Sequence, residues 1–408
     1  MAKQHKGGLI AGFDQLRAPN APTIGATTAG DEQVAVAFTA ASDAGAGTVS
    51  SFAVTGIASG ASTGASGTSS PVTVTGLTNG TEVTFSVIAI SEFGASPSSG
   101  TVTGTAEAPP IGLFGGGSNT SGDLDKIIIT TTGNATDFGG NMSDDSERQI
   151  TTCVSSSTRA LFAGGNSNPH KTTIDLFLFA SAGNAVDFGD VFTGSTGNQY
   201  GSAPASNGTK GLFAGNGAGD SNEISIVTIA TAGNGADFGN LTVGRFYAAG
   251  TSSTTRAIFG GGYADYNTID FVIIASTGNA TDFGDLTAGR MSLHNGVVSS
   301  STRGLFAGGV SAGPTVREDI IEYITMGTEG NGTDFGNLAQ DKTDGAACSS
   351  KLRGVFAGGT GYNPYTGKLN VIEYVTIATI GNAADFGDLT QTNYNQGSGG
   401  SSGHGGIA

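Results

Sequence analysis

The chain has 408 residues, of which 33 are acidic and 17 basic, so its formal net charge is −16. Excess negative charge opposes binding to nucleic acid and to anionic membrane surfaces. No run of 18 apolar residues exists to span a membrane, and the N-terminal stretch has lysines without the apolar core of a secretory signal. We therefore expect no nucleic-acid partner, no membrane span and assembly in a reducing cytoplasm.

Residues 1–18 are predicted to form an N-terminal arm that docks on a partner protein. Within them, residues 8–12 (GLIAG) loosely repeat a Gly-Leu-Phe-Ala-Gly pattern found later in the chain. The alternative is an accidental likeness in a free tail, since chain termini usually fray.

Residues 19–108 alternate apolar and polar side chains in QVAVAFTA, SSFAVTGIA, PVTVTGL and EVTFSVIAIS, which predicts half-buried strands. The segments APNAPTIGATTAGDEQVAVAFTAASD and GLTNGTEVTFSVIAISEFGASPSS resemble a fibronectin type III domain. Phe38 stands where that family usually has Trp, and Val83 replaces the Tyr of its corner hydrogen bond. The resemblance implies a β-sandwich that serves as a spacer or a weak adhesion module.

Residues 109–408 contain six copies of a repeat with a period near 50 residues. Each copy has an apolar strand that ends in Phe and small residues, followed by an Asp-Phe-Gly motif. The Phe residues are Phe114, Phe162, Phe213, Phe259, Phe306 and Phe356, and the motif begins at Asp137, Asp187, Asp237, Asp282, Asp334 and Asp385. Four short β-type segments per copy predict a six-bladed β-propeller. A solenoid is the alternative, but it needs polar capping repeats.

The two ends of the repeat region suggest how the ring closes. The first copy lacks the strand that precedes the apolar strand in the other copies, and the C-terminal GSGGSSGHGGIA matches that strand in phase. We expect residues 400–407 to pair with Leu113 and Phe114, so that the C-terminal strand completes the first blade.

The repeats resemble kelch repeats through residues 290–298, 305–309 (LFAGG), 321–323 (IEY) and 334–336 (DFG), with Phe in place of the usual Trp. The sequence pattern LFAGG…TGNATDFGDLT more closely resembles kelch-like, Gly-rich repeats in virion structural proteins of tailed phages. The hosts of these phages are marine bacteria, including cyanobacteria. This resemblance implies a virion protein, assembled in the host cytoplasm.

Chemistry-bearing clusters are scarce in the sequence. The four histidines are not at metal-ligand spacing, and a kinase reading of Asp-Phe-Gly fails without the other kinase motifs. Asp144, Asp145 and Glu147 offer a calcium site as an alternative to solvated surface charge. Cys153 and Cys348 are expected to be free, partly buried and far apart. We predict no catalytic residue, no cofactor and no metal.

Two sets of charges recur with the repeat. Basic residues precede the apolar strand at Arg159, Lys210, Arg256, Arg303 and Arg353, with His404 in the sixth place. Acidic residues lie on the next strand at Asp125, Asp175, Asp270, Glu322 and Glu373, with Ser225 as the exception. We expect the acidic set to face solvent. We expect the Asp-Phe-Gly aspartates to be structural, with Arg256 and Arg303 bonded to one of them.

Candidate contact residues lie where the copies diverge, in the loops after Gly-Gly. They are Tyr263, Asp265 and Tyr266 in the fourth copy and Tyr362, Asn363 and Tyr365 in the sixth. Tyr beside Asp or Asn suits sugar rings, and subunit contact is the alternative.

The sequence as a whole predicts a non-enzymatic virion protein on the tail or another exterior part. It would brace neighbouring subunits or contact a host surface glycan or protein, with other virion proteins as partners and homo-oligomers giving avidity. The alternatives are a glycan-binding or glycan-degrading tail fibre or spike, which as an enzyme needs two facing carboxylates, and a cytoplasmic kelch adaptor.

Overall fold

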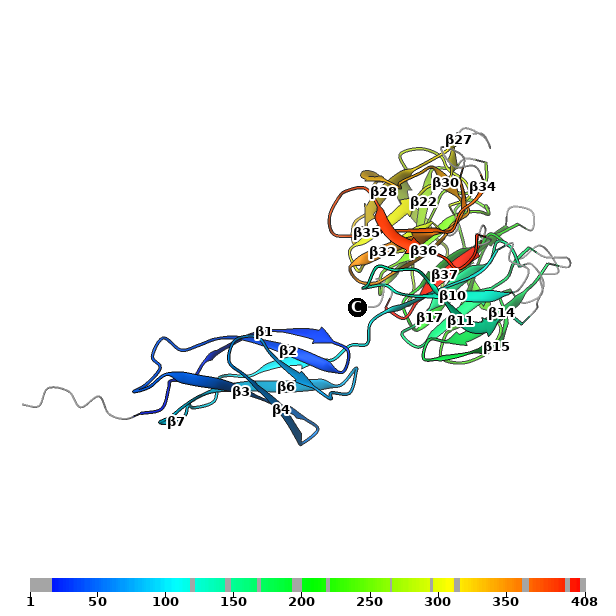
Figure 1. Cartoon of the computed structure of the whole chain (residues 1–408). Coiled ribbons are helices and arrows are strands. Elements are labelled where there is room, and N and C mark those ends of the chain that lie inside the picture. The colour runs from blue at the N-terminus through cyan, green and yellow to red at the C-terminus, as the bar shows by residue number, and fades with distance from the viewer. Residues whose placement is uncertain are drawn as a thin grey trace, which may run out of the picture. The chain divides into compact units, whose positions relative to one another are not determined.

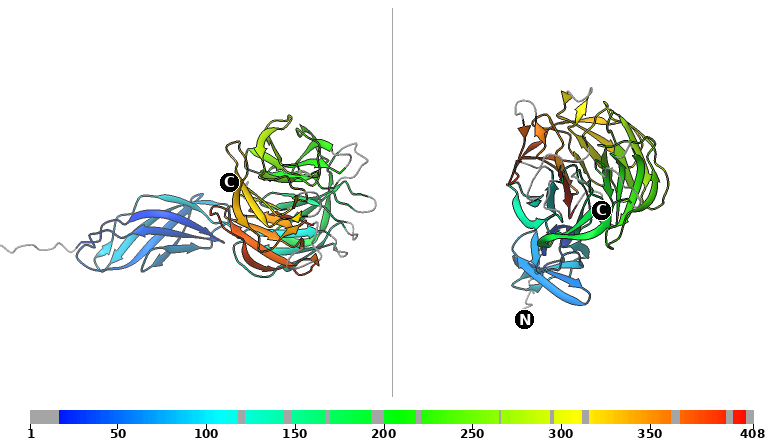
Figure 2. Two further views of the ribbon diagram at one scale, coloured as in Figure 1. Left: turned by 90° about the horizontal axis from the view of Figure 1, so that it is seen from above. Right: turned by 90° about the vertical axis from the view of Figure 1, so that its right-hand side faces the viewer.

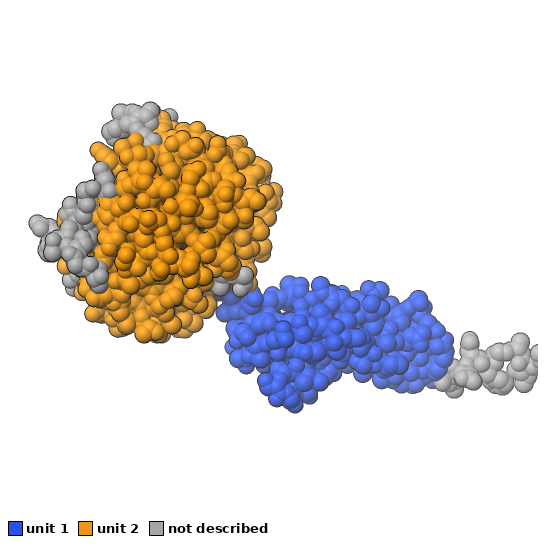
Figure 3. Space-filling view, turned by 180° about the vertical axis from the view of Figure 1, so that it is seen from behind, with its two compact units in different colours: residues 1–109 blue, residues 110–408 orange. Residues whose placement is uncertain are grey.

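The computed structural model describes residues 17–117, 122–143, 148–166, 170–192, 200–217, 221–264, 266–293, 296–311, 316–361, 367–392 and 397–403. They belong to two compact units, residues 1–109 and 110–408 (Figure 3). Every regular element in these ranges is a β-strand and every pairing is antiparallel, which confirms the predicted all-β class.

The N-terminal unit consists of two sheets around one apolar core. The first sheet has the order β1 (Thr23–Gly30), β2 (Gln33–Thr39) and β5 (Val72–Thr75). The second has the order β4 (Ala61–Gly67), β3 (Val49–Ala58), β6 (Glu82–Ser91) and β7 (Gly94–Ala95), and β8 (Val102–Thr105) also pairs with β6. Alternating residues of both sheets fill the core, where the rings of Phe38 and Phe52 lie 4.6 Å apart.

The C-terminal unit contains six four-stranded sheets, one for each repeat (Figures 1 and 2). In order from first to fourth strand they are: sheet 1, β37 (Gly397–Ser401), β9 (Ile111–Gly116), β10 (Asp123–Ile128), β11 (Thr136–Asn141); sheet 2, β12 (Thr152–Ser155), β13 (Arg159–Ala163), β14 (Thr173–Leu178), β15 (Ser181–Asp190); sheet 3, β16 (Ala203–Ser206), β17 (Lys210–Asn216), β18 (Ser221–Thr228), β19 (Ala236–Asn240); sheet 4, β20 (Ala249–Ser252), β21 (Arg256–Gly260), β22 (Thr268–Ile273), β23 (Thr281–Asp285); sheet 5, β24 (Val297–Ser299), β25 (Arg303–Ala307), β28 (Ile320–Thr325), β29 (Thr333–Asn337); and sheet 6, β31 (Ala346–Ser349), β32 (Arg353–Ala357), β35 (Val371–Thr376), β36 (Ala384–Asp388). Short strands in the connections are β26 (Val310–Ser311), β27 (Val316–Arg317), β30 (Lys342–Thr343), β33 (Thr360–Gly361) and β34 (Gly367–Lys368).

The C-terminal strand completes sheet 1, as predicted. Gly400 lies opposite Leu113 and Gly399 opposite Phe114 in the pairing of β37 with β9. The strand begins at Gly397, earlier than expected, and residues 404–407 lie outside the described residues. The first strands also contact one another in an unbroken cycle, β37 to β12, β16, β20, β24, β31 and back to β37.

The recurrent Gly-Asn segment of each sheet covers the Asp-Phe-Gly edge strand of the preceding sheet. Between sheets 6 and 1, the amide of Gly133 donates to the Phe386 carbonyl at 2.7 Å, and the amide of Ala135 donates to Asp388 at 2.8 Å. Gly387 has φ +151°, and a Cβ there would lie 2.5 Å from the Gly133 carbonyl. Only glycine permits this approach, which leaves little of the edge strand open to other chains.

The antiparallel order gives each sheet two distinct ends. We call one end the loop face; it carries the connections between second and third strands and the segments that precede the first strands. The other, the turn face, carries the remaining connections. Because Ile111 begins a second strand, the chain reaches sheet 1 at the turn face.

Candidate functional site

The recurrent acidic residues are buried, so the prediction that they face solvent is wrong. Asp270 and Arg245 have side chains with no exposed area, and their O and N atoms are 3.0 Å apart. Asp270 also accepts hydrogen bonds from the amide of Thr242 at 3.2 Å and from its hydroxyl at 2.6 Å. Asp270 lies on the third strand of sheet 4, whereas Thr242 follows the fourth strand of sheet 3, so this carboxylate joins two sheets.

The same arrangement, here called the inter-sheet clamp, recurs around the unit. The amides of Ser143, Thr242, Thr287, Ala339 and Thr390 donate to Asp175, Asp270, Glu322, Glu373 and Asp125, respectively. Buried ion pairs join Arg148 to Asp175, Arg245 to Asp270, Arg290 to Glu322 and Lys342 to Glu373. The bond from Thr390 to Asp125 joins sheet 6 to sheet 1, at the junction where the chain closes on itself.

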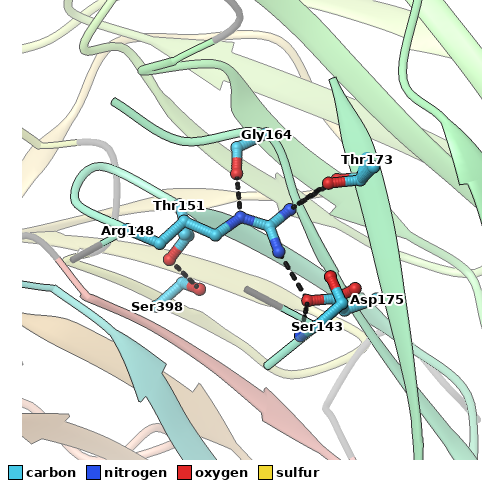
Figure 4. Close-up of polar contacts among 7 residues, drawn as sticks. All are labelled: Ser143, Arg148, Thr151, Gly164, Thr173, Asp175 and Ser398. Atoms are coloured by element: carbon cyan, nitrogen blue, oxygen red, sulfur yellow. Dashed lines mark hydrogen bonds and ion pairs between the residues drawn. The ribbon is translucent and has the colours of Figure 1, made fainter. Parts of the chain in front are cut away.

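Figure 4 shows the clamp of sheet 2. Besides its ion pair with Asp175, Arg148 donates from Nε to the Gly164 carbonyl at 2.7 Å and from Nη2 to the Thr173 carbonyl. Thr151, close by in the chain, shares a hydrogen bond of 3.0 Å with Ser398 of β37. A guanidinium that is held by backbone carbonyls and a carboxylate fixes position, and it has no access to a substrate.

The junction between sheets 2 and 3 has no acid. Ser225 replaces it and donates its hydroxyl to the Val191 carbonyl. The sequence also has Ser195 where the pattern Leu-x-x-x-Arg of residues 241–245 has its cation.

The recurrent basic residues do not bond to the Asp-Phe-Gly aspartates, so that prediction is also wrong. Arg303 donates to the carbonyls of Ile377 and Ala378 on the next sheet, at 3.1 and 3.0 Å, and its guanidinium lies 4.7 Å from the centroid of the Tyr323 ring. Arg159 and Arg353 make equivalent bonds to the following sheets, and Arg256 bonds to the Met326 carbonyl and approaches Glu329. These cations are second inter-sheet links, at the turn face.

The Asp-Phe-Gly aspartates are exposed, whereas their phenylalanine neighbours are buried. Exposed in this way are Asp137, Asp187, Asp237, Asp282, Asp334 and Asp385. Asp137 accepts the amide of Gly139 at 2.8 Å, which is the turn-capping role that the sequence suggested.

A narrow cavity runs between the first strands. Serines line it at equivalent positions, Ser155, Ser206, Ser252, Ser299, Ser349 and Ser401. Neighbouring serines bond to each other, for example Ser206 Oγ to the Ser155 carbonyl at 3.1 Å and Ser252 Oγ to the Ser206 carbonyl at 2.6 Å. The volume of about 80 Å³ suffices for two or three water molecules and excludes a sugar or a nucleotide.

Both cysteines face this cavity, on strands that flank β37 on either side. Cys153 belongs to sheet 2 and Cys348 to sheet 6, and both contact the lining of the same cavity. They are free thiols, as predicted, but both are buried instead of partly buried, and they line one cavity instead of lying far apart. Burial raises the pKa of both thiols, so they are poor nucleophiles and poor metal ligands at neutral pH.

The loop face of sheets 2 to 4 carries an aromatic cluster, defined here as His170, Tyr200, Phe246, Tyr247 and Tyr263. The rings of Phe246 and Tyr263 are stacked, with centroids 4.8 Å apart and planes 23° apart. Phe246 also lies 4.6 Å from Tyr247, and Tyr200 contacts His170, Phe246 and Tyr247 at 5.4 to 6.2 Å. Tyr263 is 48% exposed, so one large aromatic surface is open at this face.

Asp344 extends this cluster toward sheet 6. Tyr247 and Asp344 both have left-handed backbones, with φ of 58° and 59°, two residues before the first strand of their sheets. Burial, the Tyr200 hydroxyl and the Asp344 carboxylate raise the pKa of Tyr247 to about 12. Burial likewise raises the pKa of Asp344 to about 6, against hydrogen bonds from Thr343 and Ser292 that lower it.

Of the predicted contact residues, the structure brings Tyr263 into the cluster. Tyr266 lies nearby, and its backbone bonds to Gly262 and Arg290. Asp265, Tyr362, Asn363 and Tyr365 lie outside the described residues, as do Asp144, Asp145 and Glu147. No group of three or more His, Cys, Asp and Glu in the described ranges could hold a metal ion, and none of their elements is a helix suited to crossing a membrane.

Sequence reasoning missed Tyr200, Phe246, Tyr247, His170 and Asp344. A signal was present, because the segments before the first strands diverge as much as the loops after Gly-Gly. Four of the nine tyrosines fall within residues 200–266.

No protein-family model matches the chain, and no curated protein matches it. Function is therefore inferred from the residues themselves.

Proposed function

We propose that the chain is a non-enzymatic structural protein on the tail or another exterior part of a tailed phage particle. In this proposal a fibronectin type III-like sandwich precedes a six-bladed, kelch-like propeller that the C-terminal strand closes. The Gly-rich repeat sequence, through its resemblance to phage virion repeats, supports the phage assignment. Six four-stranded sheets with cyclic first-strand contacts support the propeller.

The observation that carries the proposal is the linkage of every sheet to the next. Buried clamps link five of the six junctions through carboxylates, Ser225 links the sixth, and arginines at the turn face add further links. Such linkage gives a rigid scaffold whose loops are held in place. The loop face carries the divergent loops and the aromatic cluster, and we assign to it the contact with neighbouring subunits or with the host surface.

The proposal that the chain is not an enzyme rests on the burial and bonding of its recurrent carboxylates. The acids that recur in every repeat but one are buried and bonded to amides or cations, so they cannot meet a glycosidic bond. A glycosidase needs one acid to give a proton and a second to attack or to activate water, about 5 to 10 Å away.

The alternative is a receptor-recognition protein of a fibre or spike, and the exposed aromatic cluster favours its glycan-binding form. In both cases the partners are other virion proteins, through an arm at residues 1–18, and homo-oligomers that repeat a weak contact. Residues 1–16 of that arm lie outside the described residues.

The exterior location is tested with antibodies against the C-terminal unit. They are applied to intact, purified particles of the phage that encodes the chain and viewed by immunogold electron microscopy. We expect gold on the tail or another exterior part. Particles that stay unlabelled, while the infected lysate contains the protein in free form, would contradict the proposal.

The absence of enzymatic activity is tested with host surface polysaccharide. Incubation with the purified chain is expected to release no new reducing ends. Release that Asp344→Asn abolishes would replace the structural proposal with the glycan-degrading one.

A further inference from the structure

Tyr247, one member of the aromatic cluster, has a left-handed backbone with φ 58°, a conformation that residues with a Cβ rarely adopt. The equivalent position in sheet 3 is Gly201, with φ 71°. Ile150, Ser292 and Asp344 have the same backbone before other first strands, so the left-handed turn belongs to the repeat. What distinguishes sheet 4 is that this turn carries a tyrosine beside Phe246.

Neighbouring glycines make room for the rings. A Cβ on Gly217 would lie 2.4 Å from the Tyr200 ring, and a Cβ on Gly201 would lie 2.9 Å from the Tyr247 ring. Backbone bonds hold the two stacked segments together, with the amide of Tyr263 donating to the Phe246 carbonyl at 2.7 Å. The rings are thus held in position before any ligand arrives, which lowers the entropy cost of binding.

The repeat does not require these aromatic residues. The other segments before the first strands carry Ile150, Ser292 and Asp344 at the left-handed positions, and these sheets form equally well. Four of the six described tyrosines lie on this one face, whereas Tyr323 and Tyr374 belong to third strands. Packing of the sheets therefore does not explain the cluster.

We propose that the aromatic cluster binds the pyranose rings of a neutral polysaccharide. The exposed ring of Tyr263, which Phe246 backs on one side, offers the flat apolar surface onto which the C–H face of a pyranose stacks. The Tyr263 hydroxyl offers a hydrogen-bond partner for a hydroxyl group of the sugar.

Charge selects this ligand class over other stacking ligands. The net charge of −16 repels acidic sugars, nucleotides and nucleic acid. Each of these would need compensating cations. Arg245 and Arg290 are held in buried inter-sheet clamps, while Lys171 follows His170 in the chain, so the preference against anions rests on the net charge. A neutral glycan needs no compensating cations. The inference deepens the proposed host-surface contact and rests on it only for the biological source of the glycan.

The test uses the full-length chain and neutral oligosaccharides: maltohexaose, laminarihexaose and mannohexaose. Binding is measured by saturation-transfer difference NMR and by isothermal titration calorimetry, with polygalacturonate as the acidic comparison. We expect at least one neutral hexasaccharide to bind with millimolar to high micromolar Kd and to receive saturation at its ring C–H protons. Polygalacturonate is expected to bind at least tenfold more weakly.

Variants locate the site. Tyr263→Ala removes the exposed ring and should weaken binding roughly five- to tenfold, because the sugar loses its stacking surface. Tyr263→Phe keeps the ring and should stay within about threefold of the parent. Ile380→Ala is the control, because this side chain is equally exposed but lies at the turn face.

The inference is overturned if no neutral oligosaccharide binds, if the acidic polymer binds more tightly, or if Tyr263→Ala and Ile380→Ala behave alike. If Tyr263→Ala lowers the melting temperature, its loss of binding is ambiguous. Binding by Tyr263→Phe and saturation of the sugar's ring C–H protons then test whether the sugar stacks on this ring. Glycan binding by a chain that antibodies do not find on particles would preserve this inference and defeat the virion proposal. Antibody-labelled particles together with a chain that binds no glycan would preserve the virion proposal and defeat this inference.

Discussion

The inter-sheet clamp at Arg245 and Asp270 gives a prediction whose size follows from the structure. Both side chains are fully buried, and the pair joins sheets 3 and 4. Asp270→Asn keeps the size of the side chain and an oxygen that accepts the Thr242 amide, but it removes the negative charge. The Arg245 guanidinium would then be a buried charge without its counter-ion.

We expect Asp270→Asn to lower the free energy of unfolding of the C-terminal unit by about 3–5 kcal/mol, the usual cost of breaking a buried pair. Burial already lowers the pKa of Arg245, and the Asp270 charge opposes this effect. In the double variant Asp270→Asn/Arg245→Met, an unbranched apolar side chain replaces the cation. Two of the guanidinium nitrogens, Nε and Nη1, have no hydrogen-bond partner, so the double change should cost at most about 2 kcal/mol.

Differential scanning calorimetry of the full chain measures both variants, and the transition of the N-terminal unit serves as the internal reference. Arg17→Ala is the control for an ion pair, because Arg17 and Asp43 form an exposed pair and its loss should cost less than about 1 kcal/mol. Arg245→Met alone completes the cycle. If the costs of Asp270→Asn and Arg245→Met simply add in the double variant, or if Asp270→Asn costs under about 1 kcal/mol, the account of the clamp is refuted.

Three further predictions concern other parts of the unit. Asp344→Asn should stabilise the protein by roughly 1–3 kcal/mol at pH 7 and by much less at pH 4. The pKa of Asp344 is about 6 in the folded protein, above that of an aspartate in the unfolded chain, so the parent loses stability as the pH rises toward and through 6. Urea unfolding at several pH values checks this, and a difference independent of pH contradicts it. Deleting residues 397–408 removes β37 and opens the edge of β9, so the melting temperature of the whole C-terminal unit should fall by roughly 10 °C or more. An unchanged calorimetric transition would argue against completion of sheet 1 by this strand. Gly387→Ala places a Cβ against the Gly133 carbonyl and should lower the free energy of unfolding by about 1–3 kcal/mol. In the control Gly381→Ala the new Cβ meets nothing within 4 Å, so the loss should be much smaller. Equal losses in chemical denaturation would show that the close approach is unimportant.

The sequence by itself was sufficient for the all-β class, for six repeated units and for the completion of sheet 1 by the C-terminal strand. These features are local or periodic. Turn residues such as Gly and Asn and the Phe that ends each apolar strand act through their immediate neighbours in the chain. The matching phase of residues 397–401 with the first strands of other repeats is visible without coordinates.

The partners of the recurrent charges were decided by tertiary structure. Alternation along a strand shows which residues share a face but not whether another sheet covers that face. In this unit sheets pack on both sides, so Asp270 and its equivalents are buried against the preceding sheet instead of facing water. Arg303 likewise reaches the next sheet instead of an Asp-Phe-Gly aspartate.

The aromatic cluster also exists only in three dimensions. His170 and Tyr263 are far apart in the chain, and they belong to connections of sheets 2 and 4. Three consecutive sheets bring these connections to one face, where Tyr200 and Phe246 complete the contacts. A site assembled from separate repeats depends on how the sheets pack side by side, and the spacing of residues within one repeat carries no information about it.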